Sequence, residues 1–467
     1  MSLKQRLLAI VLIACVLIGI SIVGLSGLKM QEEPVDIIVD NTPKKETIYF
    51  WYSDEEMSDL IASAAVAFGE ERDVRVIPVL VSASNYLETI NEATMTETQM
   101  PDAYIIDNDA LGKAYLAGLA DEVEDTLGVL SDTHFPQSAL SAVTYKDKLV
   151  AYPYYFETSA LLYNKTYLQE WTAAQMAGES GEDVDVEFTD DAIVDPEDPN
   201  YEDTDGKLVI SQAQLEAGIP TTLDELLAFA DNYDAPDVVE AVLKWDVSDV
   251  FYNYYFAGAY MNVGGPNGDD KEQINIYNDE TKQCLQIFQN LNQFFSIDAD
   301  DVTMDGILQE FIEGKLVFTI VKPDAVEILE TAKTEGTFTY DYGIIAMPKL
   351  SEQLDGSTMA VTNCVAINGY SKHKELANDF ATFLTTMYLE KLYSRAGKLS
   401  ACYGENQSNS NLNAFMTEYE TSVSLPKLLE TENFWLQLEI TLAKVWSGED
   451  IDTQLKALAD QIALQLQ

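Results

Sequence analysis

Strand-like and helix-like patterns alternate along the chain from residue 47 onward. β-branched and aromatic runs predict strands, and apolar residues that recur at helical spacing predict helices between them. In order, the predicted elements are strand 47–51, helix 59–68, strand 74–81, helix 86–95, strand 101–106 and helix 111–119. Because strands that alternate with helices are typical of α/β proteins, we expect a mainly parallel sheet with helices on both faces.

The N-terminal segment has a different pattern. Lys4 and Arg6 precede an uncharged stretch of 22 residues, 7–28, which is long enough to cross a bilayer as a helix. It exceeds the usual signal-peptide core of roughly 7–15 residues. We therefore expect residues 1–30 to be a membrane-spanning anchor whose positive end stays in the cytoplasm, with the rest of the chain on the extracellular face of the cell membrane.

Cleavage of this segment is the alternative. Gly24 and Ser26 are small residues at a spacing that signal peptidase reads, and their use would release a secreted protein. Cys15 lies inside the apolar run, so a lipid anchor is disfavoured. Residues 31–46 are rich in Pro, Asp, Glu and Lys and predict a polar tether.

Composition limits the possible partners. The 467 residues include 79 acidic and 27 basic side chains, a net charge of −52, which repels nucleic acid phosphates. Nucleic acid is therefore excluded as a partner, and a monomer is expected. With 47% hydrophobic residues the chain is globular, and its length favours two lobes.

One segment is far more acidic than the rest. Between Glu179 and Asp205, thirteen of 27 residues are acidic and none is basic, which predicts a solvated insertion loop over 175–210. A calcium loop is a weaker reading, because the stretch that ends at Gly206 lacks an acid at the first liganding position. After it, the hydroxyl and acidic residues of 221–225 predict a capped helix start.

The chain offers little material for catalysis or metal binding. His134 and His373 are its only histidines, and Cys284, Cys364 and Cys402 have no metal-like spacing and are expected to be buried or free thiols. Nucleophile-elbow, phosphate-loop, dinucleotide and zinc-protease motifs are absent from the sequence. We expect no catalytic residue, no metal and no cofactor, although a glycosidase carboxylate pair cannot be read from so acidic a composition.

Two acidic loops follow predicted strands, at 53–55 and 107–109. Ligands of α/β sheets bind beyond the carboxyl ends of the strands, so Asp54, Glu55 and Asp109 are candidate hydrogen-bond acceptors for ligand hydroxyls. The alternative interpretation is that these acidic residues cap the helices that follow them.

Several local patterns occur in a characteristic order over residues 48–464. They are Trp51-Tyr-Ser-Asp54-Glu55, Pro101-Asp102 through Asp109, Tyr152-Pro153 through Glu157 to Tyr163-Asn164-Lys165, Phe311 through Gly314 to Phe318, Ile367-Asn368 through Ser371 to Glu375, and Phe434-Trp435. In this order the chain resembles the extracellular solute-binding proteins of family 1, the group of the bacterial maltose-binding protein.

The resemblance implies a two-lobed, type II periplasmic-binding-protein-like α/β fold with a hinge between the lobes. Lobe 1 would comprise 47–154 and 356–413, and lobe 2 would comprise 155–355 and 414–467. The implied function is the carbohydrate-binding subunit of an ABC importer, which captures a sugar by hinge closure and delivers it to the permease. The implied ligand contacts are Asp54, Glu55, Asp109, Glu157, Tyr155, Phe251 and Trp435.

Two departures bear on the ligand. This chain has Ile106 and Asp324 where the family's reference member places tryptophans, which argues against long maltodextrins. Rival functions are a binding protein for a cationic ligand such as a polyamine, a surface-anchored sugar sensor and, more remotely, a glycoside hydrolase.

Overall fold

The computed structural model describes residues 45–96, 99–180, 186–189, 208–404, 409–423, 425–429 and 433–466. The predicted anchor and all but the end of the tether lie outside these residues. In the part of the chain that the structure describes, no helix combines the length and apolar character needed to span a bilayer. Residues 46–467 form one compact unit.

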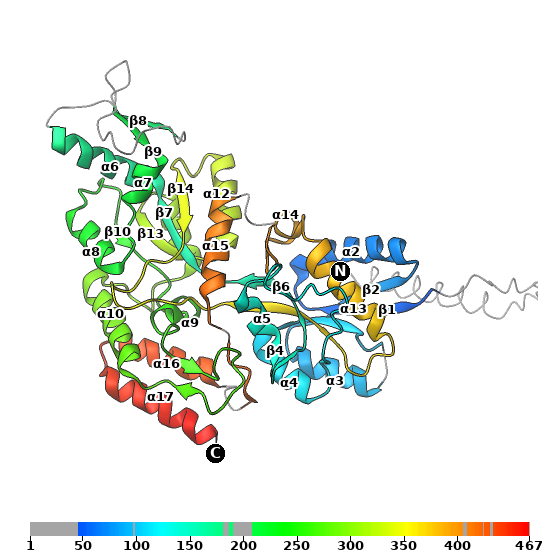
Figure 1. Cartoon of the computed structure of the whole chain (residues 1–467). Coiled ribbons are helices and arrows are strands. Elements are labelled where there is room, and N and C mark those ends of the chain that lie inside the picture. The colour runs from blue at the N-terminus through cyan, green and yellow to red at the C-terminus, as the bar shows by residue number, and fades with distance from the viewer. Residues whose placement is uncertain are drawn as a thin grey trace, which may run out of the picture. The chain divides into compact units, whose positions relative to one another are not determined.

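Six strands form the first sheet, in the order β16-β6-β15-β3-β1-β2. Their bounds are β1 (Thr47–Tyr52), β2 (Arg75–Leu80), β3 (Ala103–Asp107), β6 (Tyr152–Glu157), β15 (Val361–Ile367) and β16 (Leu399–Ser400). The helices around it are η1 (Glu55–Met57), α2 (Ser58–Arg72), α3 (Tyr86–Thr96), η2 (Asn108–Ala110), α4 (Leu111–Leu116), α5 (Gln137–Val143), α13 (Lys374–Thr382), η4 (Phe383–Met387) and α14 (Leu392–Ala396). Figure 1 shows these elements together in lobe 1, from blue through cyan to orange.

The expectation of a mainly parallel sheet is wrong, because three of the five strand pairings in this sheet are antiparallel. β1 runs parallel to β2 and β3, but β15 is antiparallel to both β3 and β6, and β16 is antiparallel to β6. β6 leaves this sheet toward the second one and β15 returns from it. Because the returning chain enters at the edge where β3 ends, β15 must run against β3.

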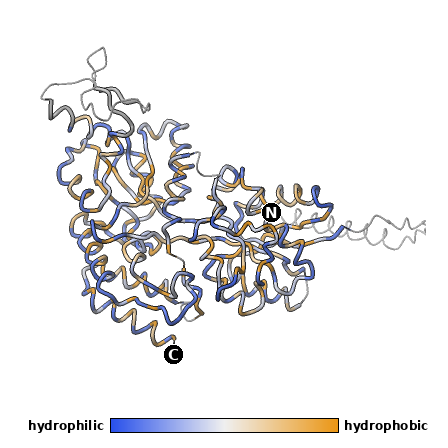
Figure 2. The backbone as a smooth tube through the Cα atoms, viewed as in Figure 1, coloured by the Kyte–Doolittle hydropathy of each residue, from blue (hydrophilic) through white to orange (hydrophobic). Residues whose placement is uncertain are grey.

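The second sheet has four strands in the order β10-β13-β7-β14 and is also mixed. Its strands are β7 (Ala160–Asn164), β10 (Ala241–Leu243), β13 (Leu316–Val321) and β14 (Tyr342–Ile345). Lobe 2 also contains α6 (Lys165–Ser180), α7 (Gln212–Ala217), α8 (Leu223–Asn232), α9 (Val250–Asn253), η3 (Tyr254–Phe256), α10 (Asp279–Phe295), α11 (Met304–Ile312), α12 (Asp324–Glu335), α15 (Ser410–Thr421), α16 (Phe434–Trp446) and α17 (Ile451–Gln465). Figure 2 shows hydrophobic segments along the central strands of both lobes and hydrophilic segments toward the outside.

Three two-stranded ladders complete the described elements. They are β4 (Thr144–Tyr145) with β5 (Lys148–Leu149), β8 (Val186–Thr189) with β9 (Leu208–Ser211), and β11 (Asn262–Val263) with β12 (Ile274–Asn275). The parallel β8–β9 ladder lies within or at the end of the predicted insertion loop 175–210, and α6 extends into it as far as Ser180. That segment is therefore not wholly loop, and its most acidic part, 190–207, lies outside the described residues.

The predicted capped helix start is confirmed, and a second set of hydrogen bonds ties the first sheet together. Thr222 caps α8 by accepting a hydrogen bond from the Glu225 backbone N–H, and the Glu225 carboxylate accepts one from the backbone N–H of Thr221 in return. The Asp102 carboxylate accepts from the Tyr49 backbone N–H at 2.8 Å and from the Ser371 hydroxyl at 2.6 Å. The last two contacts hold β1, the start of β3 and the segment after β15 together.

The chain crosses between the two sheets through buried residues that carry a hydrogen-bonded network. The Thr158 hydroxyl, between β6 and β7, lies 2.9 Å from the Thr358 hydroxyl and 2.8 Å from the Met359 carbonyl oxygen, both on the way from β14 to β15. The Thr358 hydroxyl donates to Oε2 of Glu418 on α15 at 3.1 Å. The network therefore joins three crossing segments. The predicted lobe boundaries at 154/155 and 413/414 fall inside β6 and α15, and the division of the chain between lobes stays a prediction.

Glu418 is the titratable member of this network. Its side chain is 7% exposed, and its Oε1 accepts the Met347 backbone N–H at 2.7 Å. Burial raises the pKa of Glu418 from 4.5 to about 7, although the hydrogen bonds from Met347 and Thr358 act in the opposite direction. The carboxyl is therefore partly protonated at neutral pH.

We predict that Glu418→Gln changes how stability depends on pH. A carboxyl whose pKa is raised on folding contributes stability that is present below its unfolded pKa of 4.5 and is lost as pH rises through about 7. The advantage of the wild type over Glu418→Gln in unfolding free energy should therefore shrink by about 2 kcal/mol between pH 5 and pH 8. Urea denaturation at both pH values measures this.

Glu420→Gln is the matched control, because Glu420 lies on the same helix with an exposed side chain. A pH-independent difference between wild type and Glu418→Gln would contradict the prediction.

Candidate ligand-binding cleft

A cavity of about 470 Å³ lies where the two lobes face each other. Its walls come from the ends of β1 and β6 and the segment around α14 on one side, and from the start of α12 on the other. The lining residues are Glu56, Phe156, Glu157, Lys322, Pro323, Asp324, Glu327, Ser394, Arg395, Ala396, Gly397 and Lys398. The volume is within the range of small-molecule sites, about 300–1,000 Å³.

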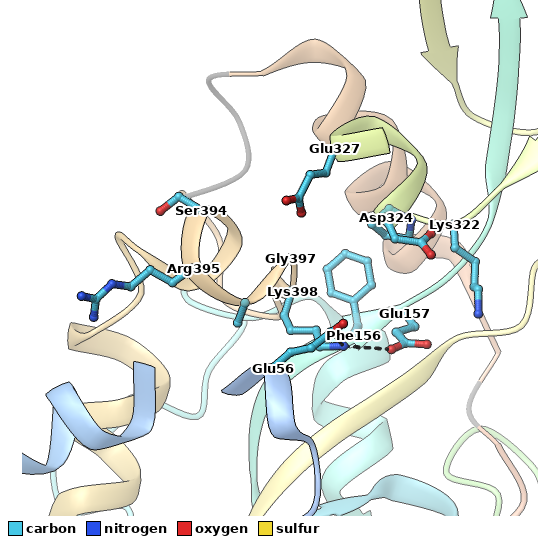
Figure 3. A pocket seen from close by; sticks show the side chains of 12 residues that line it. Glu56, Phe156, Glu157, Lys322, Asp324, Glu327, Ser394, Arg395, Gly397 and Lys398 are labelled. Carbon is cyan, nitrogen blue, oxygen red and sulfur yellow. Dashed lines mark ion pairs between the residues drawn. The ribbon is translucent and has the colours of Figure 1, made fainter. Parts of the chain in front are cut away.

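Lys398 is the centre of charge in this cavity. Its Nζ lies 2.9 Å from Asp54 Oδ2, 3.0 Å from Glu56 Oε2 and 3.7 Å from Glu157 Oε1, and its side chain is only 13% exposed. Figure 3 shows the Lys398 and Glu157 side chains pointing toward one another. Burial alone lowers the pKa of Lys398, but hydrogen bonds to Asp54 and Glu56 and the attraction of Asp54 and Glu157 outweigh burial and raise that pKa above its usual value. Lys398 is therefore a cation at neutral pH.

The fold explains why these groups meet. Asp54 follows β1 and caps η1 by accepting a hydrogen bond from the Glu56 backbone N–H at 3.0 Å, while its Oδ2 contacts Lys398. Glu157 ends β6, which pairs with β16, and Lys398 directly precedes β16. Sequence reasoning found Asp54 and Glu157 but missed Glu56 and Lys398, because no motif marks a lysine between a helix and a two-residue strand.

Lobe 2 supplies the opposite wall. Asp324 and Glu327 lie in the first turn of α12, and Figure 3 shows both beside the cavity. Lys322 lies with its Nζ 5.3 Å from the centroid of the Phe251 ring. The Tyr393 hydroxyl of α14 is 3.4 Å from the Pro323 carbonyl oxygen, a direct contact between the lobes.

A second cavity of about 200 Å³ lies near the other predicted contacts. Asp109 and Trp435 both line it. The half-buried Trp435 packs edge-on against Tyr254, with ring centroids 5.6 Å apart. Phe434 is fully buried, so of the predicted aromatic pair only Trp435 is available to a ligand.

Lys427 forms the back of the second cavity and joins the two lobes. Its side chain is 1% exposed, and its Nζ donates to the carbonyl oxygen of Ser141 on α5 at 2.9 Å and to that of Asn267 in lobe 2. Burial lowers the pKa of Lys427 to about 8, against the attraction of Asp269 and Asp109. Sequence analysis did not single out this residue.

Asp107 connects the two cavities electrostatically. The Asp107 side chain is exposed to solvent, but protein atoms close to it reduce the hydration of its carboxylate. This partial desolvation, with repulsion from Asp109 and from Glu157, raises the pKa of Asp107 to about 7. Asp109 lines the smaller cavity and Glu157 the larger, so Asp107 lies near a residue of each.

The remaining predicted residues are placed less favourably. Tyr155 is 2% exposed and lines neither cavity, although Lys398 Nζ lies 5.9 Å from its ring centroid. Phe251 lies behind Lys322, and Glu55 has an exposed side chain and lines neither cavity. The structure therefore places Asp109, Glu157 and Trp435 in the cavity linings, connects Asp54 to the larger cavity through Lys398, and leaves Glu55 outside.

The reactive side chains sought in the sequence lie elsewhere. Cys284, Cys364 and Cys402 are buried, as expected. Within the described residues, no group of three or more His, Cys, Asp or Glu side chains is arranged to hold a metal ion.

Comparison with known sequences identifies relatives of the chain. A family model described as bacterial extracellular solute-binding protein matches residues 63–394. The galactooligosaccharide-binding protein of Bacillus subtilis (strain 168) is 23% identical over 426 residues, which cover 88% of this chain and 86% of that protein.

Solved structures with similar folds cover most of the chain. The extracellular solute-binding protein from Staphylococcus aureus in complex with maltose has a TM-score of 0.71 at 19% identity, over 91% of this chain and 98% of that one. The Thermus thermophilus maltotriose binding protein bound with maltotriose has a TM-score of 0.61 at 18% identity, over 90% and 100% of the two chains. The two-lobed α/β fold expected from the sequence is thereby confirmed.

We predict that Asp107 titrates near neutral pH. Desolvation and two neighbouring carboxylates raise its pKa to about 7, so its carboxyl carbon should shift between pH 6 and pH 8 in carbon-detected NMR of protein labelled at aspartate. Asp107→Asn should remove this one signal. A spectrum in which every aspartate has finished titrating by pH 5 would contradict the prediction.

Proposed function

The chain belongs to the bacterial extracellular solute-binding proteins, and on that premise we propose that it captures a carbohydrate in the cleft between its lobes. The site residues would be Asp54, Asp109, Glu157 and Trp435, joined by Glu56, Asp107 and Lys398. The cluster of three carboxylates around the ammonium of Lys398, which offers both acceptors and donors, is the observation that carries the proposal.

Sugar hydroxyls both donate and accept hydrogen bonds, and the cleft offers partners for each role. Carboxylate oxygens of Glu157 and Asp109 accept hydrogen bonds, and the ammonium of Lys398 donates them. Trp435 gives the apolar C–H face of a sugar ring a surface to pack on. Such a combination of a few polar groups with an aromatic wall is typical of small-molecule sites.

The relatives support a neutral saccharide. One relative is a galactooligosaccharide-binding protein, and the two solved structures described above contain maltose and maltotriose. The smaller cavity holds about 200 Å³ and the larger about 470 Å³, which suits a short saccharide better than a long chain.

Capture would occur by hinge closure. A ligand favours the closed form only if it contacts both lobes, and the proposed contacts meet this condition, with Glu157 and Asp109 on lobe 1 and Asp324 and Trp435 on lobe 2. The closed form would then deliver the sugar to the permease of an ABC importer. Residues 1–30 would hold the protein at the extracellular face of the membrane through residues 31–46.

Isothermal titration calorimetry tests the proposed function. The purified protein is titrated with maltose, maltotriose and galactooligosaccharides, and with amino acids and spermidine as other ligand classes. We expect a short saccharide to bind with a Kd on the order of micromolar, about 8 kcal/mol of binding free energy. Binding of spermidine alone would reject the carbohydrate proposal.

We predict that Trp435→Ala weakens binding of that saccharide by about 1 kcal/mol or more, a loss of roughly fivefold, because it removes the aromatic surface from the cleft. Trp171→Ala is the matched control, since Trp171 is a half-buried tryptophan of lobe 2 that packs on Phe229, outside both cleft cavities. Calorimetry on both variants measures the difference. Equal affinity in wild type and Trp435→Ala would remove this residue from the site.

A further inference from the structure

Basic side chains are concentrated in the larger cavity although the chain as a whole is strongly acidic. The chain has 27 basic residues against 79 acidic ones. The lining of this cavity, in contrast, contains three basic residues and four acidic ones. The charge of the cavity is therefore almost balanced.

Lys398 supplies the positive charge at the point where three carboxylates come together. An ammonium group has three N–H donors, and three carboxylates face it, at 2.9 Å (Asp54), 3.0 Å (Glu56) and 3.7 Å (Glu157). Asp54 belongs to the turn after β1 and Glu157 to the end of β6, so Lys398 is shared by separate elements of lobe 1.

The lysine has little freedom to leave this position. Gly397 before it ends α14 in the left-handed conformation, at a φ of 63°, and Leu399 after it is fully buried in β16. The side chain also passes over the ring of Tyr155. The backbone of Lys398 is thus fixed on both sides, and the three carboxylates hold its ammonium.

A lysine side chain is chemically a primary alkylammonium, the same group that a polyamine presents. We propose that Lys398 is a specificity-determining residue: an internal alkylammonium that occupies the carboxylate cluster, excludes cationic ligands from it and leaves the cleft to uncharged ones. This inference rests on the proposed carbohydrate function and extends it by assigning the ligand class to one residue. A cationic ligand would have to displace Lys398 from the carboxylates. A neutral hydroxyl group can instead accept a hydrogen bond from Lys398 while the lysine stays in place.

Removal and chemical replacement of this ammonium test the proposal. In Lys398→Ala the three carboxylates lose their cation, so the full-length variant should bind propylammonium and spermidine, which the wild type should not bind. Its affinity for the neutral saccharide should fall about tenfold or more, as for a lost hydrogen bond to a charged group. Added propylammonium should restore much of that affinity, and propanol, which has the same size without the charge, should not.

Two further variants keep the outcome interpretable. Lys391→Ala removes an exposed lysine close in sequence and should behave as the wild type in every titration. Lys398→Met keeps the alkyl stem without the charge. It replaces Lys398→Ala in the titrations if that variant does not fold, and it too should gain spermidine binding. Circular dichroism establishes folding of each variant.

The results separate the two proposals. Wild-type saccharide affinity in Lys398→Ala and no gain of ammonium binding would overturn the role of Lys398 and leave the carbohydrate function standing. Tight spermidine binding by the wild type would overturn the exclusion of cations. If the wild type binds no saccharide, the carbohydrate function fails, yet the gain of alkylammonium binding in the variants still decides whether Lys398 occupies a cation site.

Discussion

Three carboxylates meet around one lysine because the strands that carry them end at the same edge of the first sheet. β1 leads into Asp54 and η1, β6 ends at Glu157, and the short strand β16, paired with β6, places Lys398 beside both. Like charges at such distances repel strongly unless a cation lies between them. The shape of the cleft wall therefore depends on this ion cluster, in which one ammonium reduces the repulsion between three carboxylates.

The hinge and the cleft share their chain segments. Glu157 ends the strand that continues through Thr158 into lobe 2, and Thr158 is hydrogen-bonded toward Thr358 and hence to Glu418. On the other side of the cleft, Lys427 joins α5 to the Asn267 loop. A ligand that contacts Glu157 or Asp109 thus lies within a few residues of a segment that links the lobes, which is the arrangement needed for binding to alter the balance between open and closed forms.

The parts of this molecule that the sequence predicts are those governed by neighbours in the chain. The alternating pattern of residues 47–119 predicts β1, α2, β2, α3, β3 and α4 within a few residues of their bounds. The direction of β15 is not predictable in this way, since it depends on pairing with β3 more than 250 residues earlier. The site divides likewise: Asp54 and Glu157 follow recognisable strands, whereas Lys398 becomes part of the site only through the β16–β6 pairing.

The acidity of the whole chain makes an internal cation necessary in a site for neutral ligands. A net charge of −52 attracts cations to every concave surface, and a cleft with low-dielectric walls concentrates that field. The field does not attract an uncharged sugar, but it does attract cations, which therefore compete with the sugar for the cleft. Lys398, whose backbone is held between Gly397 and Leu399, lies beside three carboxylates at high effective concentration, because it cannot diffuse away. Selectivity for neutral ligands is thus compatible with an acidic surface, provided that the counter-ion is part of the chain.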